Sequence, residues 1–127
     1  DRVEDAICAT KAAIKEGIVP GGGIALLNAS QNVVSKSAGE TVLLEAIRAP
    51  FKTILANANI TLSDDQNFKK GAGLNVVTGK MVNMVRSGII DPLLVTKSAL
   101  INAASVATTI LSTDCVINNM RIDESNR

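Results

Sequence analysis

The sequence predicts an all-α, mainly helical fold with a short β element. Apolar residues recur at helical spacing in several long segments, and β-branched runs are few and short. Hydrophobic residues make up 46% of the 127 residues and charged residues 20%, which is typical of a globular chain. Because only 2% of the residues are aromatic, large core side chains are scarce, and we expect the helices to pack on protein outside this sequence.

The N-terminal part is predicted as two helices joined by a glycine-rich loop. The first helix covers residues 1–16, where apolar side chains form one stripe, and Gly17 ends it. Residues 18–20 then form an extended link to the three glycines at 21–23. The second helix follows these glycines and runs to about Val34.

The middle of the chain alternates between turns and helix. A polar turn at residues 35–40 precedes a helical segment at 42–58. Pro50 should kink or split that helix, because proline lacks an N–H donor and clashes with the preceding turn. Residues 59–70 are expected to form a loop, and residues 71–77 a tight turn beside a short strand.

A long helix is predicted near the C-terminus, after a short helical turn at residues 81–85. Asp91 and Pro92 are typical of a helix start, with Asp91 as the N-cap and Pro92 in the first helical position. The helix itself should cover residues 93–111. Its inward-facing side chains are expected to be Val95, Leu100, Val106, Ala107 and Ile110.

The last residues are predicted as a short strand at 115–117, which is β-branched and bounded by polar residues, and a loose polar tail at 120–127. Cys8 and Cys115 are far apart and fit no metal spacing, so we interpret both as small buried hydrophobes. The sequence contains no His, the commonest metal ligand, and no metal site is expected in it.

Composition also argues against two classes of partner. The formal net charge is only +1, which gives no broad attraction to nucleic acid or to acidic membranes. Stacking of bases on aromatic platforms is improbable, because only 2% of the residues are aromatic. No apolar run approaches the roughly 20 residues that span a bilayer. We therefore expect neither a nucleic-acid nor a membrane partner.

Four features could take part in ligand chemistry, and each has a purely structural alternative. Asp5 lies beside small side chains and could face an incoming group, or it could simply favour the helix dipole. The glycines after Pro20 could approach an anion at a helix N-terminus, or form an ordinary loop. Asn75 could read a base edge or stabilise a turn. Asp91 could accept a hydrogen bond from a ribose hydroxyl or serve only as an N-cap.

The order and spacing of these features resemble one protein family over nearly the whole chain. The runs at residues 1–6, 9–14 and 16–23, and later those at 88–92 and 103–107, closely resemble the C-terminal part of group I chaperonins. The match continues through residues 95–96, 98–100 and 113–116. It is weakest over residues 30–39 and 59–70. The sequence departs from the family at Leu74, where an aromatic residue is usual, and at residues 79–81, which replace a more acidic stretch.

The resemblance implies a domain assignment. Residues 1–17 would be the last helix of the intermediate domain and its hinge. Residues 18–127 would be the C-terminal half of the equatorial ATP-binding domain. In the family, the aspartate that Asp5 resembles positions the attacking water, and Gly17 resembles the hinge. Five residues resemble positions that contact the nucleotide: Gly22, Asn75, Val76, Ile89 and Asp91.

The implied function is that of a segment of an ATP-dependent protein-folding ring subunit. The full-length subunit would be an ATPase, whereas this chain alone should be inactive. The phosphate loop and the Mg²⁺ ligand would belong to the N-terminal half, which this sequence lacks. Identical subunits would be the ring partners, and unfolded client proteins and a co-chaperonin would bind through domains outside the chain.

The resemblance implies a cytoplasmic protein in a bacterium, or one of an organelle matrix or stroma in a eukaryote. Two alternatives stay open at this point. The first is a non-catalytic ring-assembly module that has lost nucleotide binding, which the departures at Leu74 and residues 79–81 permit. The second is an unrelated helical binding domain.

Overall fold

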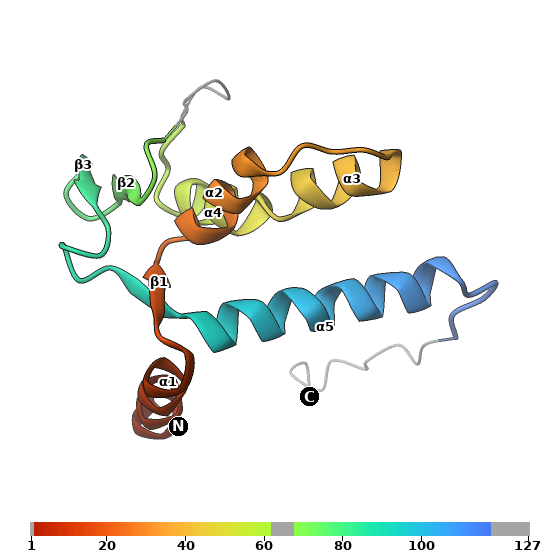
Figure 1. Ribbon diagram of the computed structural model, residues 1–127, viewed down its shortest axis with the longest axis horizontal. Helices are drawn as coiled ribbons and strands as arrows, with labels where there is room; N and C mark the ends of the chain where they lie inside the picture. Colours follow the sequence, from red (N-terminus) through yellow and green to blue (C-terminus); the bar gives the residue numbers. More distant parts are fainter. Residues whose placement is uncertain (1, 62–67, 118–127) are drawn as a thin grey trace, which may run out of the picture.

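The computed structural model describes residues 2–61 and 68–117, and it confirms a mainly helical fold with a few short strands. The helices form two groups on either side of a short paired strand (Figure 1). The described elements are α1 (Arg2–Glu16), β1 (Ile18–Pro20), α2 (Ile24–Asn32), α3 (Ala38–Ala46), α4 (Ala49–Asn57), β2 (Ala72–Asn75), β3 (Lys80–Asn83), β4 (Ile90–Pro92) and α5 (Leu93–Leu111).

Two antiparallel strand pairs connect the helices. The predicted link at residues 18–20 is indeed extended, and as β1 it pairs with β4, so that Val19 lies opposite Asp91. Strands β2 and β3 form a hairpin in which Leu74 lies opposite Met81. The prediction of a helical turn at residues 81–85 was wrong, because most of that segment completes the hairpin. A short apolar run does not by itself distinguish a strand from a helical turn.

The helical segment around Pro50 is split, as predicted. Helix α3 ends at Ala46, and α4 begins at Ala49 with Pro50 in its first turn, where proline loses no helical hydrogen bond. Helix α3 also begins earlier than expected. The Ser37 hydroxyl accepts a hydrogen bond from the Glu40 N–H at 3.2 Å, so part of the predicted polar turn is an N-cap.

The start of α5 differs from the prediction. Asp91 is not the N-cap, because it belongs to β4, and Pro92 occupies the capping position without a side-chain hydrogen bond. The first N–H of the helix, that of Leu93, instead donates to the carbonyl of Gly17 at 3.1 Å. This backbone hydrogen bond to Gly17, the residue before β1, therefore replaces the side-chain cap that the sequence had indicated.

A small core joins α2, α4 and the hairpin. Its buried members are Ile24, Leu27, Phe51, Leu55, Phe68 and Met84. The two aromatic rings meet edge to face with centroids 5.2 Å apart and planes at 77°, a geometry that the ring quadrupoles favour. Both phenylalanines of the sequence are thus used in this one cluster.

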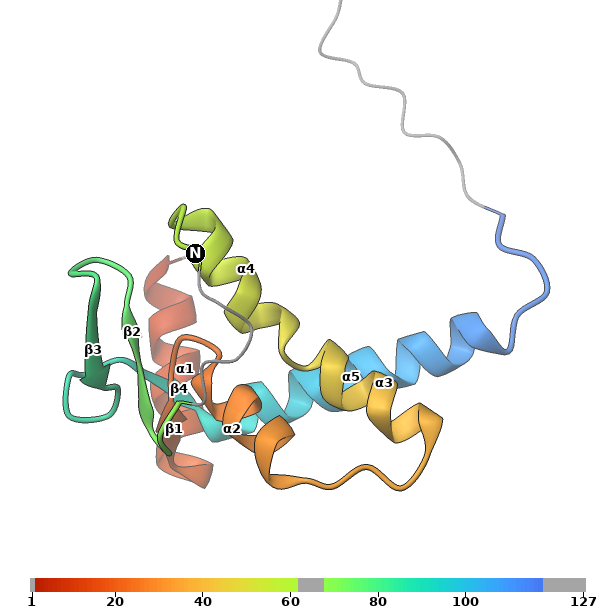
Figure 2. The same cartoon turned by 90° about the horizontal axis from the view of Figure 1, so that it is seen from above.

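Helices α1 and α5 contain no buried residue, so their apolar faces are not covered within the described chain. This contradicts the inward orientation predicted for α5, where Val106 and Ile110 are both 59% exposed. Helix α5 extends away from the hairpin in both views (Figures 1 and 2). The sequence predicted no segment that could span a bilayer, but α5 is long and apolar enough to do so by length and composition alone. Helices of soluble proteins share this length and composition, so a single such helix does not indicate a membrane protein.

The C-terminal segment also departs from expectation. Residues 115–117 are irregular and exposed in the described chain, so the predicted strand is absent from it. The predicted tail at 120–127 lies outside the described residues. Cys8 and Cys115 are both free and exposed, so the prediction that they are buried was wrong. Both cysteines lie on surfaces that no other described residue covers. The hydrophobicity of a side chain does not by itself show whether another segment covers it.

Gly23 is predicted to be a stability hot spot. It has φ +76°, and an added Cβ would lie 2.7 Å from the backbone nitrogen of Phe51. Gly79 has a similar φ of +67° but no atom near an added Cβ. We expect Gly23→Ala to lower the free energy of unfolding by about 2–5 kcal/mol and Gly79→Ala by only about 1–2 kcal/mol. Urea unfolding followed by circular dichroism would measure both, and equal losses would contradict the packing argument.

Candidate functional site

A cavity of about 410 Å³ lies between α4, the β2–β3 hairpin and the glycine loop. Four residues singled out in the sequence line it together, although they are far apart along the chain: Gly22, Asn75, Val76 and Ile89. The other lining residues are Phe51, Ile54, Leu55, Leu74, Val77, Thr78 and Met84. The cavity is in the size range of small-molecule sites.

The glycine loop can form one side of the cavity because it lacks side chains. Gly22 adopts φ +66°, and a Cβ there would lie 2.9 Å from the terminal methyl of Met84. Met84 itself is only 2% exposed, so it has little room to move. A side chain at position 22 would therefore be strained and would also push into the space next to the cavity.

Ile89 is fixed at the cavity by backbone hydrogen bonds on both sides. Its N–H donates to the carbonyl of Met84 at 2.9 Å, and its carbonyl accepts from the N–H of Gly21, also at 2.9 Å. These two bonds tie the segment after the hairpin to the glycine loop. The apolar wall and the loop opposite it are thus held by backbone contacts.

Asn75 organises the turn at the tip of the hairpin. Its side-chain oxygen accepts hydrogen bonds from the N–H groups of Val77 at 3.0 Å and Thr78 at 3.3 Å. Its main-chain carbonyl accepts from Thr78 at 3.2 Å and from Gly79 at 2.8 Å. The structural alternative considered for Asn75, stabilisation of a turn, is therefore present in the same residue that lines the cavity.

The chemistry of the lining suits a flat, weakly polar group. Among the described lining residues none is charged, and Asn75 and Thr78 supply the polar side-chain atoms. A nucleobase has apolar faces and a polar edge, and it matches this mixture of apolar walls and few polar groups. Phosphate oxygens need cationic or N–H partners, and the side chains that line the cavity provide no cation.

Asp91 is not among the residues that line the cavity. It follows Ile89 by two residues and pairs with Val19 across the β1–β4 ladder. Desolvation at its carboxyl raises the pKa of Asp91 above the ordinary value of 3.8. The residue as a whole is nevertheless exposed, and the strand pairing fixes its backbone two residues beyond Ile89.

Asp5 is not brought to the cavity. It lies in the first turn of α1, is exposed, and is separated from the cavity elements by β1 (Figure 1). Helix α1 packs on α5 and β4 instead. Gly17 ends α1 with φ +87° and donates its N–H to the Ala13 carbonyl at 2.8 Å.

An ion pair spans the junction at Gly17. The Lys97 ammonium of α5 lies 2.5 Å from a carboxylate oxygen of Glu16, the last residue of α1. Both side chains are partly exposed, so the pair contributes little free energy. It joins the ends of α1 and α5 at the same junction as the Leu93–Gly17 hydrogen bond.

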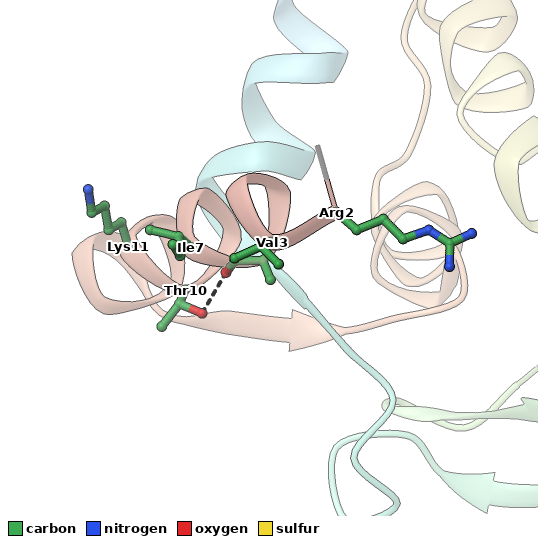
Figure 3. Close-up of a pocket in the computed structure, with 6 residues that line it drawn as sticks. Arg2, Val3, Ile7, Thr10 and Lys11 are labelled. Carbon is green, nitrogen blue, oxygen red and sulfur yellow. Dashed lines mark hydrogen bonds between the residues drawn. The ribbon is translucent and has the colours of Figure 1, made fainter.

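A second hollow, of about 450 Å³, is formed by α1 alone. It is lined by Arg2, Val3, Ala6, Ile7, Thr10 and Lys11 (Figure 3). The Thr10 hydroxyl is already used, because it donates to the Ala6 carbonyl at 2.7 Å. In the part of the chain that the structure describes, all of its lining residues belong to α1, so it is the face of one helix and not an assembled site.

Among the described residues, no group of three or more His, Cys, Asp or Glu side chains is placed to hold a metal ion. The lining residues that the sequence analysis missed are mainly Phe51, Leu55 and Met84. They also belong to the core, and helical spacing alone gave no signal that they border a cavity. The scarcity of aromatic residues could have indicated that each phenylalanine has a central position.

The described residues thus combine a mainly helical fold with a cavity lined from segments that are distant in the sequence. The chain belongs to the TCP-1/cpn60 chaperonin family, whose model matches residues 1–121. It is also similar to a solved structure described as the crystal structure of group III chaperonin in the open state. The TM-score is 0.69, the identity is 28%, and the match covers 84% of this chain and 25% of that one. This chain therefore spans a quarter of the length of that chaperonin chain.

The raised pKa of Asp91 predicts a pH-dependent effect of Asp91→Asn. The ionised carboxylate destabilises the folded state at pH values above its folded pKa, whereas below pH 3.8 both states are protonated and the penalty vanishes. The variant should therefore have a higher Tm than the original chain at pH 7, and the difference should shrink as the pH falls and vanish below 3.8.

Thermal unfolding at pH 3, 5 and 7 would measure this difference. Asp114→Asn, on the exposed C-terminal segment, controls for the loss of one negative charge. A variant that is equally stable or less stable at pH 7 would contradict the desolvation argument.

Proposed function

We propose that this chain is the part of a group I chaperonin subunit that forms the adenine and ribose side of an ATP site. The observation that supports this most directly is the cavity, because Gly22, Asn75, Val76 and Ile89 line it together. Asp91, which follows the lining residue Ile89 by two positions in β4, would accept a hydrogen bond from the ribose. The uncharged lining fits a base and leaves the phosphates to other residues.

In this proposal, residues 1–17 are the intermediate-domain helix and hinge, and residues 18–127 are the C-terminal half of the equatorial domain. Rotation of α1 about Gly17 would carry Asp5 from its exposed position to the terminal phosphate. Asp5 would there orient the attacking water and accept its proton. Mg²⁺, held by the N-terminal half, would supply positive charge at the phosphates.

The uncovered surfaces fit a subunit of a larger assembly. Helix α5 has no buried residue, and Val116 and Ile117 are 71% and 92% exposed. In a ring of identical subunits, residues 115–117 would pair as an edge strand with a neighbour, because a short β-branched segment with free backbone groups is an association site. Client proteins and a co-chaperonin would bind through domains outside this chain.

These exposed surfaces also favour a second candidate, a non-catalytic ring-assembly module. It would use the same uncovered faces, but Leu74 and residues 79–81 would have removed useful nucleotide binding. Leu74 lines the cavity, so an altered side chain there acts directly on the space for a base. Nucleotide binding by the full-length subunit separates the two functions.

The role of Asp5 can be tested in the full-length subunit. Asp5→Ala should lower the ATP hydrolysis rate about 100-fold or more, because a group that positions the water acts in the transition state. ATP affinity should stay within about threefold, since this interaction is absent from the ground state. Glu4→Ala, in the same exposed helical turn, is the matched control and should hydrolyse ATP normally. Normal turnover in Asp5→Ala would assign Asp5 to the helix surface alone.

The isolated 127-residue chain should bind Mg-ATP weakly or not at all. Its described residues offer a cavity for the base but no cationic lining for the phosphates, where most of the electrostatic stabilisation would arise. Isothermal titration calorimetry would measure this, with the full-length subunit as the comparison. Low-micromolar affinity of the isolated chain would show that the phosphate site lies within it.

A further inference from the structure

We propose that the exposed apolar face of α1 docks on α3 of a second copy of this chain. The inference does not depend on the proposed nucleotide site, because the described lining of that cavity includes no residue of either helix. It rests on two exposed apolar stripes, one on each helix, whose flanking charges have opposite signs.

The first stripe lies on α1, on side chains that α5 and β4 do not cover. Val3, Ile7 and Ile14 follow one another at helical spacing and are 73%, 50% and 81% exposed. Val3 and Ile7 line the hollow of about 450 Å³ (Figure 3). Arg2 and Lys11 line it as well, and its described lining includes no acidic residue. Helical spacing puts these two cations on opposite sides of the stripe.

The second stripe lies on α3, which contains no buried residue. Val42 and Leu43 are 68% and 45% exposed, and Ala46 extends the stripe by one turn. Glu40 and Glu45 are exposed, and helical spacing puts them on opposite sides of this stripe. They are the charged residues of α3. The stripe on α3 is therefore flanked by anions, where the stripe on α1 is flanked by cations.

Within one chain the two stripes cannot meet. Helix α1 packs on α5 and β4, and α1 and α3 lie well apart in both views (Figures 1 and 2). The contact therefore joins two copies, and it uses a different surface on each. Every copy added in this way still offers one free stripe of each kind, so association continues beyond a dimer unless a ring closes.

The apolar side chains and the flanking charges have different roles in this contact. Exposed ion pairs contribute little free energy, because water already stabilises both charges. Burial of Val3 and Ile7 against Val42 supplies most of the affinity. The charges decide which surfaces meet, since two α1 stripes or two α3 stripes would bring like charges together. Glu4 also borders the stripe on α1, but it does not line the hollow.

Charge reversal tests this pairing in the 127-residue chain. Lys11→Glu and Glu45→Lys each place like charges opposite one another, so each variant by itself should self-associate about tenfold more weakly than the original chain. An equimolar mixture should recover the original affinity within about threefold. The reason is that Lys11→Glu keeps an unaltered α3 and Glu45→Lys keeps an unaltered α1. Analytical ultracentrifugation at physiological salt would measure the Kd of each sample.

Lys15→Glu provides a matched control. It makes the same change of net charge on the same helix, but Lys15 does not line the hollow. This variant should therefore associate like the original chain. Circular dichroism of every variant checks that its helices are intact, which is expected because the substituted side chains are all exposed.

Chemical cross-linking locates the contact without any substitution. A carbodiimide couples a lysine amine directly to a carboxylate that lies against it. In a mixture of unlabelled and heavy-nitrogen-labelled chains, cross-linked peptides that carry one label each come from two different copies. We expect such peptides to join Lys11 of one copy to Glu40 or Glu45 of the other.

Several results would overturn the inference. One is an original chain that stays monomeric up to about 1 mM. Others are Lys11→Glu associating as strongly as the original chain, the mixture associating no better than its components, or Lys15→Glu weakening association as much as Lys11→Glu. Cross-links between copies that join Lys11 only to carboxylates outside α3 would overturn it as well. Each of these results leaves nucleotide binding by the full-length subunit untouched, so the proposed function is tested separately.

Discussion

The structure depends on the close approach of the glycine loop at residues 21–23 to two other segments. The N–H of Gly21 donates to the Ile89 carbonyl. Gly23 lies so close to Phe51 that an added Cβ would be 2.7 Å from the Phe51 backbone nitrogen, so no side chain fits there. This contact brings α2, α4 and the segment after the hairpin into one cluster. Without it, the core around Ile24 and Met84 could not close, and the cavity would lose one wall.

Local features of the fold could be predicted from the sequence where one residue decides the backbone. Gly17 ends α1, and Pro50 splits the helix that would otherwise run through it. Pairing between distant segments could not be predicted in this way. Residues 81–83 became strand because β2 lies beside them, and Asp91 joined β4 because β1 lies opposite it. Their local sequence is compatible with either outcome.

For the candidate site, the sequence indicated residues better than it indicated geometry. Four of the residues chosen through the family resemblance, among them Asn75 and Ile89, line one cavity, whereas Asp91 is not part of the lining and Asp5 lies on a separate helix. The apolar lining from α4 was missed because core packing and cavity lining use the same side chains. The inward orientation of the α5 side chains was also misjudged, since helical periodicity shows which face is apolar but not what covers it.

The cavity is assembled from segments that are distant in the sequence, since Gly22 and Ile89 face the same space from opposite parts of the chain. Such long-range contacts form late in folding, because the intervening chain must first lose its freedom. A ligand that fills the cavity can therefore bind only to chains in which both parts have already met. Each tenfold excess of ligand over its Kd would add about 1.4 kcal/mol to the stability of the folded chain. Occupancy of the cavity would therefore protect correctly closed chains from unfolding and proteolysis.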